Sequence, residues 1–244
     1  MKGKLHFFPL QDKSCLLYLP PQQTGPLPLV VTLAGSSLAG ELEAVMAAVE
    51  PAMEEDLCAP FLLAAFAPAD WNSEFTPWPA PALQKNAPPF GGRAGQTLAF
   101  VQEALIPYIE ERFSVLPGPQ GRMLLGYSLG GLTALWAAYR TDSFGAVASC
   151  SGSLWYDGWA EFMEKNRPAG PVSVYLSLGR DEEHTRSPRM KAVGPNTRTA
   201  SWHCNQDARV VRHTYREQPG GHFDNIPQRL AEALLWLNKP TNRA

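Results

Sequence analysis

Cysteine is scarce in this chain, which also lacks long apolar runs and an excess of one charge. Four cysteines, at positions 15, 58, 150 and 204, are spread over 244 residues without a CxxC pair, so neither a zinc ribbon nor a disulfide framework is indicated. The 21 lysines and arginines nearly balance the 23 aspartates and glutamates, so no strong field favours nucleic acid or a membrane surface. We therefore expect a small-molecule partner, no nucleic acid and no membrane.

Signals for export are missing as well. The opening "MKGKLHFFPLQDKSC" has no apolar run followed by a small-residue cleavage site. No apolar stretch approaches the roughly 18 residues of a membrane-spanning helix. Cysteines without a disulfide pattern are typical of a reducing compartment. We therefore expect a cytoplasmic protein.

Strand-like apolar runs alternate with segments of helical period. Residues 26–35 and 60–68 are typical buried strands, whereas 41–56 and 95–113 have apolar residues at helical spacing. Pro51 should kink or end the first of these helices. The pattern continues with strands at 122–128, 145–155, 171–179 and 208–217 and with helices at 129–140 and 226–239.

This alternation predicts the fold class. Repeated β-α units favour an α/β fold with a mainly parallel central sheet and helices on both faces. A chain of 244 residues with this pattern usually shares one core, so we expect a single domain over 1–244. Residues 4–20 should add an antiparallel hairpin at the edge. Residues 67–95, rich in proline and aromatic side chains, should form an ordered connection that covers the substrate site.

The segment "LLGYSLGGL" (124–132) carries the clearest chemical signal. Its Gly-x-Ser-x-Gly motif is centred on Ser128, between a predicted strand and a predicted helix, which is the setting of a nucleophile elbow. Gly126 and Gly130 allow a strained turn that raises the serine hydroxyl above the sheet. A purely structural tight turn is the alternative, and the strand-turn-helix setting favours the nucleophile.

A serine nucleophile needs a base, which in this architecture follows the acid along the chain. Of the five histidines, His222 fits best, because "QPGGHFDN" places it in a glycine-flanked loop between the last strand and the last helix. The acid should follow the strand 171–179, where "GRDEEH" offers Asp181, Glu182 and Glu183. It would orient the imidazole and stabilise the imidazolium. Such a run is ordinarily a solvated turn; Glu182 is the preferred acid, followed by Glu183.

Two backbone N–H groups are expected to stabilise the oxyanion. One belongs to Leu129, directly after the nucleophile, and the other to Ser36 or Ser37 in "AGSSLAG". A helix N-cap is the alternative role of those two serines.

Aromatic residues in the loops beyond the strand ends are expected to line the substrate site, in particular Trp78, Trp155 and Tyr156. The alternative is that these side chains merely pack the long loops together. We assign no residue to a metal.

Blocks spread over nearly the whole chain are similar to one enzyme family. They are "FTPWPAPAL", "FGGRAGQTLAFVQEALIPYIEERF", "GYSLGGLTALWAAY", "SGSLWYDG", "SLGRDEEHTRSPRM" and "GGHF". Together they resemble the esterase family that contains esterase D and the enterochelin esterases, especially its small cytoplasmic, trilactone-hydrolase-like members. The resemblance implies an α/β-hydrolase fold and hydrolysis of carboxylic esters without a metal or organic cofactor. It also implies Ser128 as nucleophile, His222 as base and Glu182 as acid, or a serine-histidine dyad without an acid.

The sequence leaves several substrate classes and several types of reaction open. Basic residues after the acid would attract an anionic substrate such as a ferric catecholate siderophore, or would form only a solvated face: Arg180, Arg186, Arg189, Lys191 and Arg198. We rank a general carboxylesterase above a siderophore esterase. An acyltransferase would use the same triad and pass the acyl group to another alcohol. A catalytically silent binding protein would normally have lost the serine or the histidine, and both are present.

Overall fold

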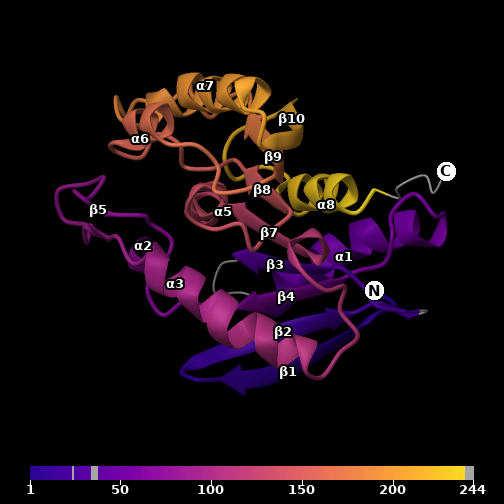
Figure 1. Cartoon of the computed structure of the whole chain (residues 1–244). Coiled ribbons are helices and arrows are strands. Elements are labelled where there is room, and N and C mark those ends of the chain that lie inside the picture. Colours follow the sequence, from indigo (N-terminus) through magenta and orange to yellow (C-terminus); the bar gives the residue numbers. More distant parts are fainter. Residues whose placement is uncertain (24, 34–37, 240–244) are drawn as a thin grey trace.

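The computed structural model describes residues 1–23, 25–33 and 38–239. Within these residues, the fold is built on an eight-stranded sheet in the order β1-β2-β4-β3-β7-β8-β9-β10 (Figure 1). Its strands are β1 (Lys4–Leu10), β2 (Lys13–Leu19), β3 (Leu29–Leu33), β4 (Leu62–Phe66), β7 (Arg122–Tyr127), β8 (Ala146–Cys150), β9 (Val172–Gly179) and β10 (Val210–Gln218).

The sheet is parallel except at one edge. All neighbouring strands from β4 to β10 in the sheet order run parallel. Strands β1 and β2 form an antiparallel hairpin, and β2 also pairs antiparallel with β4. The predicted α/β fold with a mainly parallel sheet is therefore confirmed.

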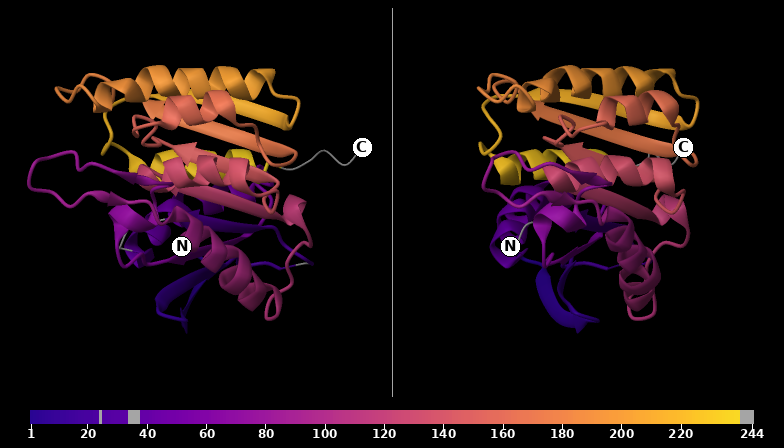
Figure 2. Two further views of the ribbon diagram at one scale, coloured as in Figure 1. Left: turned by 60° about the vertical axis from the view of Figure 1, so that its left-hand side comes forward. Right: turned by 90° about the vertical axis from the view of Figure 1, so that its left-hand side faces the viewer.

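Helices cover both faces of the sheet, as the alternation of side chains along the strands requires. In β3, Leu29, Val31 and Leu33 belong to one buried cluster and Val30 to the other. Helices α1 (Leu38–Glu54) and α8 (Ile226–Leu237) cover the face of Val30. The opposite face is covered by α3 (Ala94–Phe100), α4 (Ile106–Glu110), α5 (Leu129–Arg140), α6 (Trp159–Lys165) and α7 (Val193–Gln206) (Figure 2).

Two helices differ from the sequence predictions at proline residues. Helix α1 continues through Pro51 and ends at Glu54, one turn later; the ring is exposed, and a single N–H is lost. The predicted helix 95–113 is interrupted by a π-helical turn at Val101–Leu105, where the N–H of Ile106 bonds to the carbonyl of Val101. Pro107 follows directly, and the wider turn relieves the clash of its ring with the preceding turn.

The long connection 67–95 is ordered by local structure. It contains the short helix α2 (Trp71–Glu74), and the strands β5 (Pro79–Ala80) and β6 (Phe90–Gly91) form a small antiparallel sheet. Its N-terminal part lies beside the carboxyl ends of the parallel strands, because Pro68, Ala69 and Trp71 line a cavity there. Ligands bind at this edge in open α/β sheets.

Candidate active site

Ser128 occupies the sharp turn between β7 and α5. Its backbone has φ 58° and ψ −122°, a strained conformation for a residue with a side chain. Neighbouring glycines make the turn possible, because a Cβ on Gly126 would overlap the carbonyl of Gly130, and a Cβ on Gly130 would overlap the carbonyl of Leu33. Local sequence thus forces the serine out of both the strand and the helix, with its hydroxyl at the carboxyl end of the sheet.

His222 and Glu182 reach Ser128 from loops that follow neighbouring strands. The Nε2 atom of His222 lies 3.0 Å from Ser128 Oγ, and its Nδ1 lies 2.7 Å from Glu182 Oε2. Glu182 follows β9 and His222 follows β10, which pair side by side. The carboxylate accepts from Nδ1–H, which leaves Nε2 free to accept the proton of the serine hydroxyl.

The two oxygens of Glu182 have different partners. Oε2 contacts His222, whereas Oε1 accepts hydrogen bonds from Ser151 Oγ at 2.7 Å, the Gly179 N–H at 2.7 Å and Arg229 Nη1 at 2.9 Å. Burial raises the pKa of Glu182, but the hydrogen bond and charge of His222 and the hydrogen bonds from Ser151 and Gly179 outweigh burial and hold this pKa below its ordinary value. The carboxylate is therefore ionised at neutral pH despite its burial.

Arg229, from α8, joins the acid to the loop that carries His222. Its side chain is almost fully buried, and its Nη2 donates to the carbonyls of Pro219 and Gly221 at 2.9 Å each. Nη1 also contacts the hydroxyl of Tyr127 at 3.2 Å, which in turn donates to the carbonyl of His222 at 2.6 Å. One guanidinium thus contacts the acid and holds two carbonyls, those of Pro219 and Gly221, in the segment that leads to His222.

The two other carboxylates of the "DEE" run point elsewhere. Glu183 forms an ion pair with Arg198 at 2.9 Å. Asp181 is exposed, and its carboxylate lies 3.8 Å from His184 Nδ1. The structure therefore brings only Glu182 of the three candidates to His222, because successive residues of a tight turn point in different directions.

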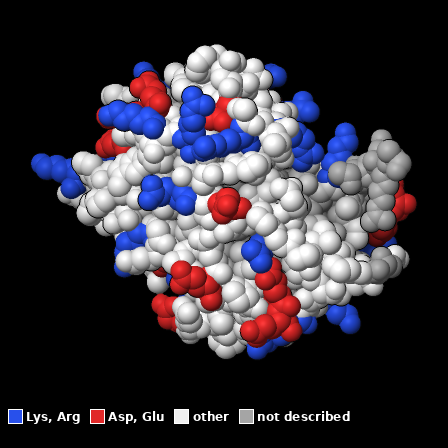
Figure 3. All heavy atoms as spheres, viewed as in Figure 1, with Lys and Arg blue, Asp and Glu red and all other residues white. Residues whose placement is uncertain are grey.

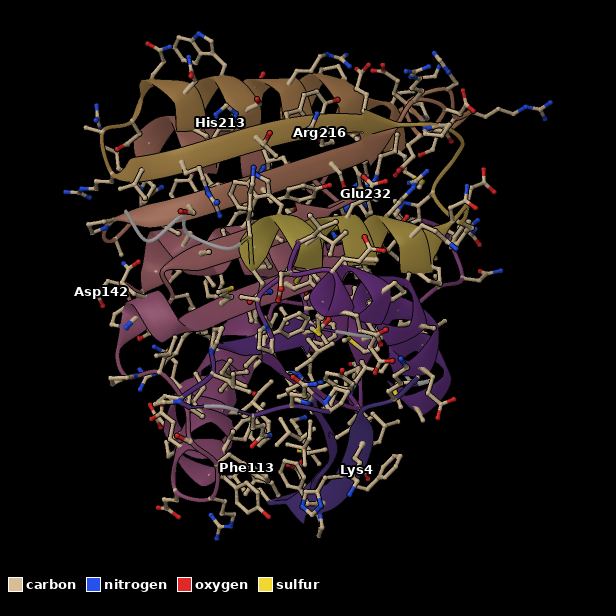
Figure 4. All side chains as sticks on the ribbon, turned by 90° about the vertical axis from the view of Figure 1, so that its right-hand side faces the viewer. Lys4, Phe113, Asp142, His213, Arg216 and Glu232 are labelled. Carbon is tan, nitrogen blue, oxygen red and sulfur yellow. The ribbon has the colours of Figure 1, made fainter. Side chains whose placement is uncertain are left out.

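The remaining histidines lie away from Ser128. His213 is on the edge strand β10 (Figure 4), where its Nε2 lies 2.9 Å from Ser201 Oγ. His6 stacks on Phe8 in the hairpin at the opposite edge of the sheet. His203 lies in α7.

The first of the two expected oxyanion donors is the N–H of Leu129, the residue that follows Ser128. Leu129 is the first residue of α5, so its N–H has no acceptor within the helix and lies at the positive end of the helix dipole. Ser36, the second expected donor, and the alternative Ser37 lie outside the described residues.

A cavity of about 580 Å³ opens at Ser128 and His222, a size typical of small-molecule sites. Its walls are mainly apolar and come from the strand ends, the start of α1, the 68–71 segment, the loop before α8 and the first turns of α8. They are formed by Thr32, Leu33, Glu41, Pro68, Ala69, Trp71, Tyr127, Ser128, His222, Phe223, Ile226 and Leu230.

The three aromatic residues predicted to line the substrate site are not among these residues. Trp78 donates its indole N–H to the carbonyl of Asp157 at 2.7 Å, and Tyr156 donates its hydroxyl to the carbonyl of Trp78 at 2.6 Å. Trp155 and Tyr156 are buried and pack against Phe90. The three side chains join the long connection to the loop after β8, and their contact with a substrate stays a prediction.

Three residues at the site were not singled out from the sequence. Arg229 carries a detectable signal, because it lies on the apolar stripe of α8 with Ile226, Leu230 and Ala233, where an arginine is unexpected. Phe223 follows His222 directly and could have been considered with it. Ser151 has no sequence signal; it sits among small residues after β8 and acts through a contact distant in the chain.

Neither a metal cluster nor a membrane span is found in the described part of the chain. No group of three or more His, Cys, Asp or Glu side chains in residues 1–23, 25–33 and 38–239 is arranged to hold a metal ion. Among the same residues, no helix has the length and apolar character needed to cross a bilayer.

The parallel sheet and its strand-turn-helix at Ser128 place the chain in the α/β-hydrolase class. The family model described as "Putative esterase" matches residues 11–235. The protein YbbA of Bacillus subtilis (strain 168) is 34% identical over 187 residues, which cover 75% of this chain and 74% of that protein. The chain therefore belongs to the esterase family, and it is a carboxylic ester hydrolase.

Solved structures of similar proteins agree with this fold. Siderophore hydrolase EstA from Aspergillus nidulans has a TM-score of 0.76 at 16% identity, over 97% of this chain and 94% of that one. An IroE-like serine hydrolase from Shewanella oneidensis has a TM-score of 0.77 at 15% identity, over 96% of this chain and 78% of that one. At such identities the similarity concerns the fold, and it confirms the expected α/β-hydrolase architecture.

Proposed function

We propose that the chain hydrolyses carboxylic esters through a Ser128–His222–Glu182 triad and an acyl-enzyme. The observation that carries the proposal is the continuous hydrogen-bonded series from Ser128 Oγ to His222 Nε2 at 3.0 Å and from His222 Nδ1 to Glu182 Oε2 at 2.7 Å. Nucleophile, base and orienting acid within hydrogen-bond reach are the geometric requirement for an activated serine.

The reaction has two steps. In the first, His222 Nε2 takes the hydroxyl proton while Ser128 Oγ bonds to the ester carbonyl carbon, and the alcohol then leaves with that proton as its C–O bond breaks. In the second, His222 takes a proton from water, and the resulting hydroxide attacks the acyl carbon. Ser128 regains its proton from His222 as the carboxylic acid product is released. The N–H of Leu129 stabilises the oxyanion in both steps, and Glu182 stabilises the imidazolium.

The substrate is a small-molecule ester, with a siderophore-type trilactone and a small aryl or acyl ester as the two candidates. The cavity at Ser128 supports a small molecule, since its volume is about 580 Å³. EstA, a structural relative, is a siderophore hydrolase, which supports the first candidate. The mainly apolar walls support the second. An acyltransferase is the alternative reaction, in which an alcohol takes the place of water in the second step.

A fluorophosphonate probe and p-nitrophenyl acetate test the proposal together. We expect a covalent adduct on Ser128, with adduct and hydrolysis lost in Ser128→Ala and hydrolysis lost in His222→Ala. The chain offers a matched control, because Ser201 and His213 form a second serine-histidine pair at 2.9 Å, away from the cavity. Ser201→Ala and His213→Ala should keep both adduct and hydrolysis.

The opposite results would refute the mechanism. No adduct, together with hydrolysis that persists in Ser128→Ala, would leave a hydrolase-shaped binding protein. Transfer of the acyl group to an added alcohol in preference to water would identify an acyltransferase with the same triad.

A further inference from the structure

The turn that follows β8, with the sequence Ser151-Gly152-Ser153, packs directly against the nucleophile elbow. The N–H of Ser153 donates to the carbonyl of Ser128 at 3.0 Å. Glycines make this approach possible, because a Cβ on Gly131 of α5 would lie only 3.0 Å from the Cα of Gly152. Ser151 has φ 46°, a strained backbone for a residue with a side chain, and such strain is common at active sites. The surrounding structure therefore holds this turn against Ser128.

The two serine hydroxyls of this turn contact opposite ends of the proposed triad. Ser151 Oγ donates to Glu182 Oε1 at 2.7 Å, and Ser153 Oγ lies 3.3 Å from Ser128 Oγ. Ser153 is only 2% exposed, and a buried hydroxyl needs a hydrogen-bond partner. Within the described residues, the partner of the Ser153 hydroxyl is the oxygen of the nucleophile.

The direction of this hydrogen bond follows from the protonation of His222. Nδ1–H of His222 donates to Glu182, so Nε2 accepts the proton of the Ser128 hydroxyl at 3.0 Å. A serine hydroxyl has one proton and two lone pairs, so in this state Ser128 Oγ accepts and Ser153 Oγ donates. At 3.3 Å the bond is long for two neutral hydroxyls. We expect it to shorten when negative charge develops on Ser128 Oγ.

The reactivity of Ser128 depends on such direct contacts. Positive and negative side chains are interspersed on the face of the molecule in Figure 3. Exposed charges of mixed sign largely cancel and are screened by salt. Ser153 is not among the described residues that line the cavity, so its hydroxyl contacts Ser128 from the protein interior and leaves the cavity side of the oxygen to the substrate.

Formation of an acyl-enzyme changes this contact. When Ser128 Oγ bonds to the acyl carbon, it becomes the bridging oxygen of an ester, whose lone pairs are delocalised toward the carbonyl. Such an oxygen is a poor acceptor, so the buried Ser153 hydroxyl loses its partner, which is unfavourable. The hydrogen bond is restored as the bond between Oγ and the acyl carbon breaks and Ser128 regains its proton from His222. The O–H bond of Ser153 stays intact throughout.

We propose that Ser153 is a catalytic residue that favours release of the acyl group, because its hydroxyl donates to Ser128 Oγ in the free enzyme and in the transition states and lacks this partner in the acyl-enzyme. The inference rests on the proposed function, since Ser153 acts on the proposed nucleophile. Loss of the hydroxyl raises the energy of the free enzyme and of both transition states by similar amounts and leaves the acyl-enzyme nearly unaffected. Acylation, measured by kcat/KM, then changes little, whereas deacylation slows.

Ser153→Ala tests the inference with p-nitrophenyl acetate, whose good leaving group makes acylation fast and deacylation rate-limiting. We expect kcat to fall about tenfold, the rate equivalent of one typical hydrogen bond, KM to fall by a similar factor and kcat/KM to change by less than about threefold. A burst of nitrophenolate and a larger fraction of acyl-enzyme, measured by intact mass during turnover, should accompany this change. A residue that only stabilises the fold would leave KM and the fraction of acyl-enzyme unchanged.

Ser149→Ala is the matched control. Ser149 lies in β8, just before the same turn, and is as buried as Ser153. Its Oγ has no hydrogen-bond partner among the described residues, so the kinetic constants should stay those of the parent protein. Ser153→Ala removes one oxygen atom and keeps the backbone hydrogen bond to Ser128, so the fold should persist. Titration with the fluorophosphonate counts the active molecules of each variant.

The possible outcomes separate this inference from the proposed function. No accumulation of acyl-enzyme in Ser153→Ala beyond that in the parent protein would overturn the role of Ser153, whether kcat and KM are unchanged or kcat/KM alone falls. The esterase mechanism would remain intact in that case, with Ser128 of the parent protein labelled by the fluorophosphonate. An unlabelled Ser128 and no hydrolysis by the parent protein would instead refute the proposed function.

Discussion

Arg229 is the residue whose replacement tests the construction of the site most directly. Its guanidinium contacts Glu182 Oε1 at 2.9 Å, and it also holds the carbonyls of Pro219 and Gly221. Arg229→Met keeps most of the side-chain volume and removes the charge and these hydrogen bonds. Arg229→Lys keeps the charge but cannot bind both groups at once, because an ammonium lacks the planar fork of a guanidinium. Comparison of the two variants therefore separates the effect of the positive charge of Arg229 from the effect of its hydrogen-bond geometry.

The stability effect follows from burial. Arg229 and Glu182 have side chains that are 2% and 3% exposed, so Arg229→Met leaves a buried carboxylate without its full counter-charge. Removal of one partner of a buried ion pair typically costs about 3–5 kcal/mol. Urea unfolding should show a decrease of this size for Arg229→Met and a smaller one for Arg229→Lys. In the folded fraction, a displaced His222 loop should lower kcat by about a hundredfold, with KM little changed.

The pH profile distinguishes an electrostatic role from a merely structural one. Without Arg229, the Glu182–His222 pair binds its first proton at higher pH, whichever of the two residues holds it. A unit charge about 6 Å away contributes roughly 3 kcal/mol at an effective dielectric constant of about 20. Because about 1.4 kcal/mol corresponds to one pH unit, the acidic limb of kcat/KM should move up by about one to two units in Arg229→Met.

Other titratable side chains on the neighbouring elements also influence the acidic limb. Besides Arg229 of α8 they are Glu41 of α1, Tyr127 of β7, and Asp181, Glu183, His184 and Asp224 of the adjoining loops. These groups stay the same in the Arg229 variants, and Arg229→Lys should leave the acidic limb nearly where it was. An unchanged limb in Arg229→Met, with activity lost only in proportion to unfolded protein, would refute the electrostatic reasoning.

Three further predictions concern single residues. Glu182→Gln should lower kcat about a thousandfold with little change in KM in steady-state kinetics; a loss below tenfold would indicate that Ser128 and His222 act as a dyad. Gly130→Ala should cost about 1–3 kcal/mol in urea unfolding, because its Cβ would meet the Leu33 carbonyl, whereas the control Gly95→Ala has open space and should be neutral or stabilising. Glu50 accepts from the backbone N–H groups of Lys2 and Gly3 and from the Tyr18 hydroxyl; burial raises its pKa, but these hydrogen bonds outweigh burial and lower it. Glu50→Gln should therefore destabilise by about 2 kcal/mol at pH 7, and the difference from the parent protein should shrink as the pH falls through the lowered pKa of Glu50 and the carboxylate becomes protonated; a difference independent of pH would contradict this.

Much of the architecture is predictable because its causes are local. The periodicity of 26–35 and 60–68 gives β3 and β4, and "RMLLGYSLGGL" gives β7, the turn and the start of α5. Helix ends and irregular turns were less predictable. The π-helical turn before Pro107 and the passage of α1 through Pro51 depend on how each helix packs on the sheet, because packing offsets the loss of single backbone hydrogen bonds.

The residues of the site also differ in how far the sequence could identify them. Ser128 and His222 could be selected from the chain, because the first needs flanking glycines and the second a flexible loop after the last strand. For the acid, the sequence favoured Glu182 over Glu183 and Asp181, but the three consecutive carboxylates differ mainly in the direction of their side chains, which the folded turn sets. Their partners lie far away: His222 is 40 residues from Glu182 and 94 from Ser128.

Composition, periodicity and the Gly-x-Ser-x-Gly turn were sufficient to establish the α/β class, the edge hairpin and the position of the serine, because each depends on backbone preferences within a few residues. The contacts of Glu182 with Arg229 and Ser151 and the separation of Trp78 from the cavity walls required the folded molecule. They arise where the ends of β7, β8, β9 and β10 meet one another and α8, and packing there selects which side chains face inward.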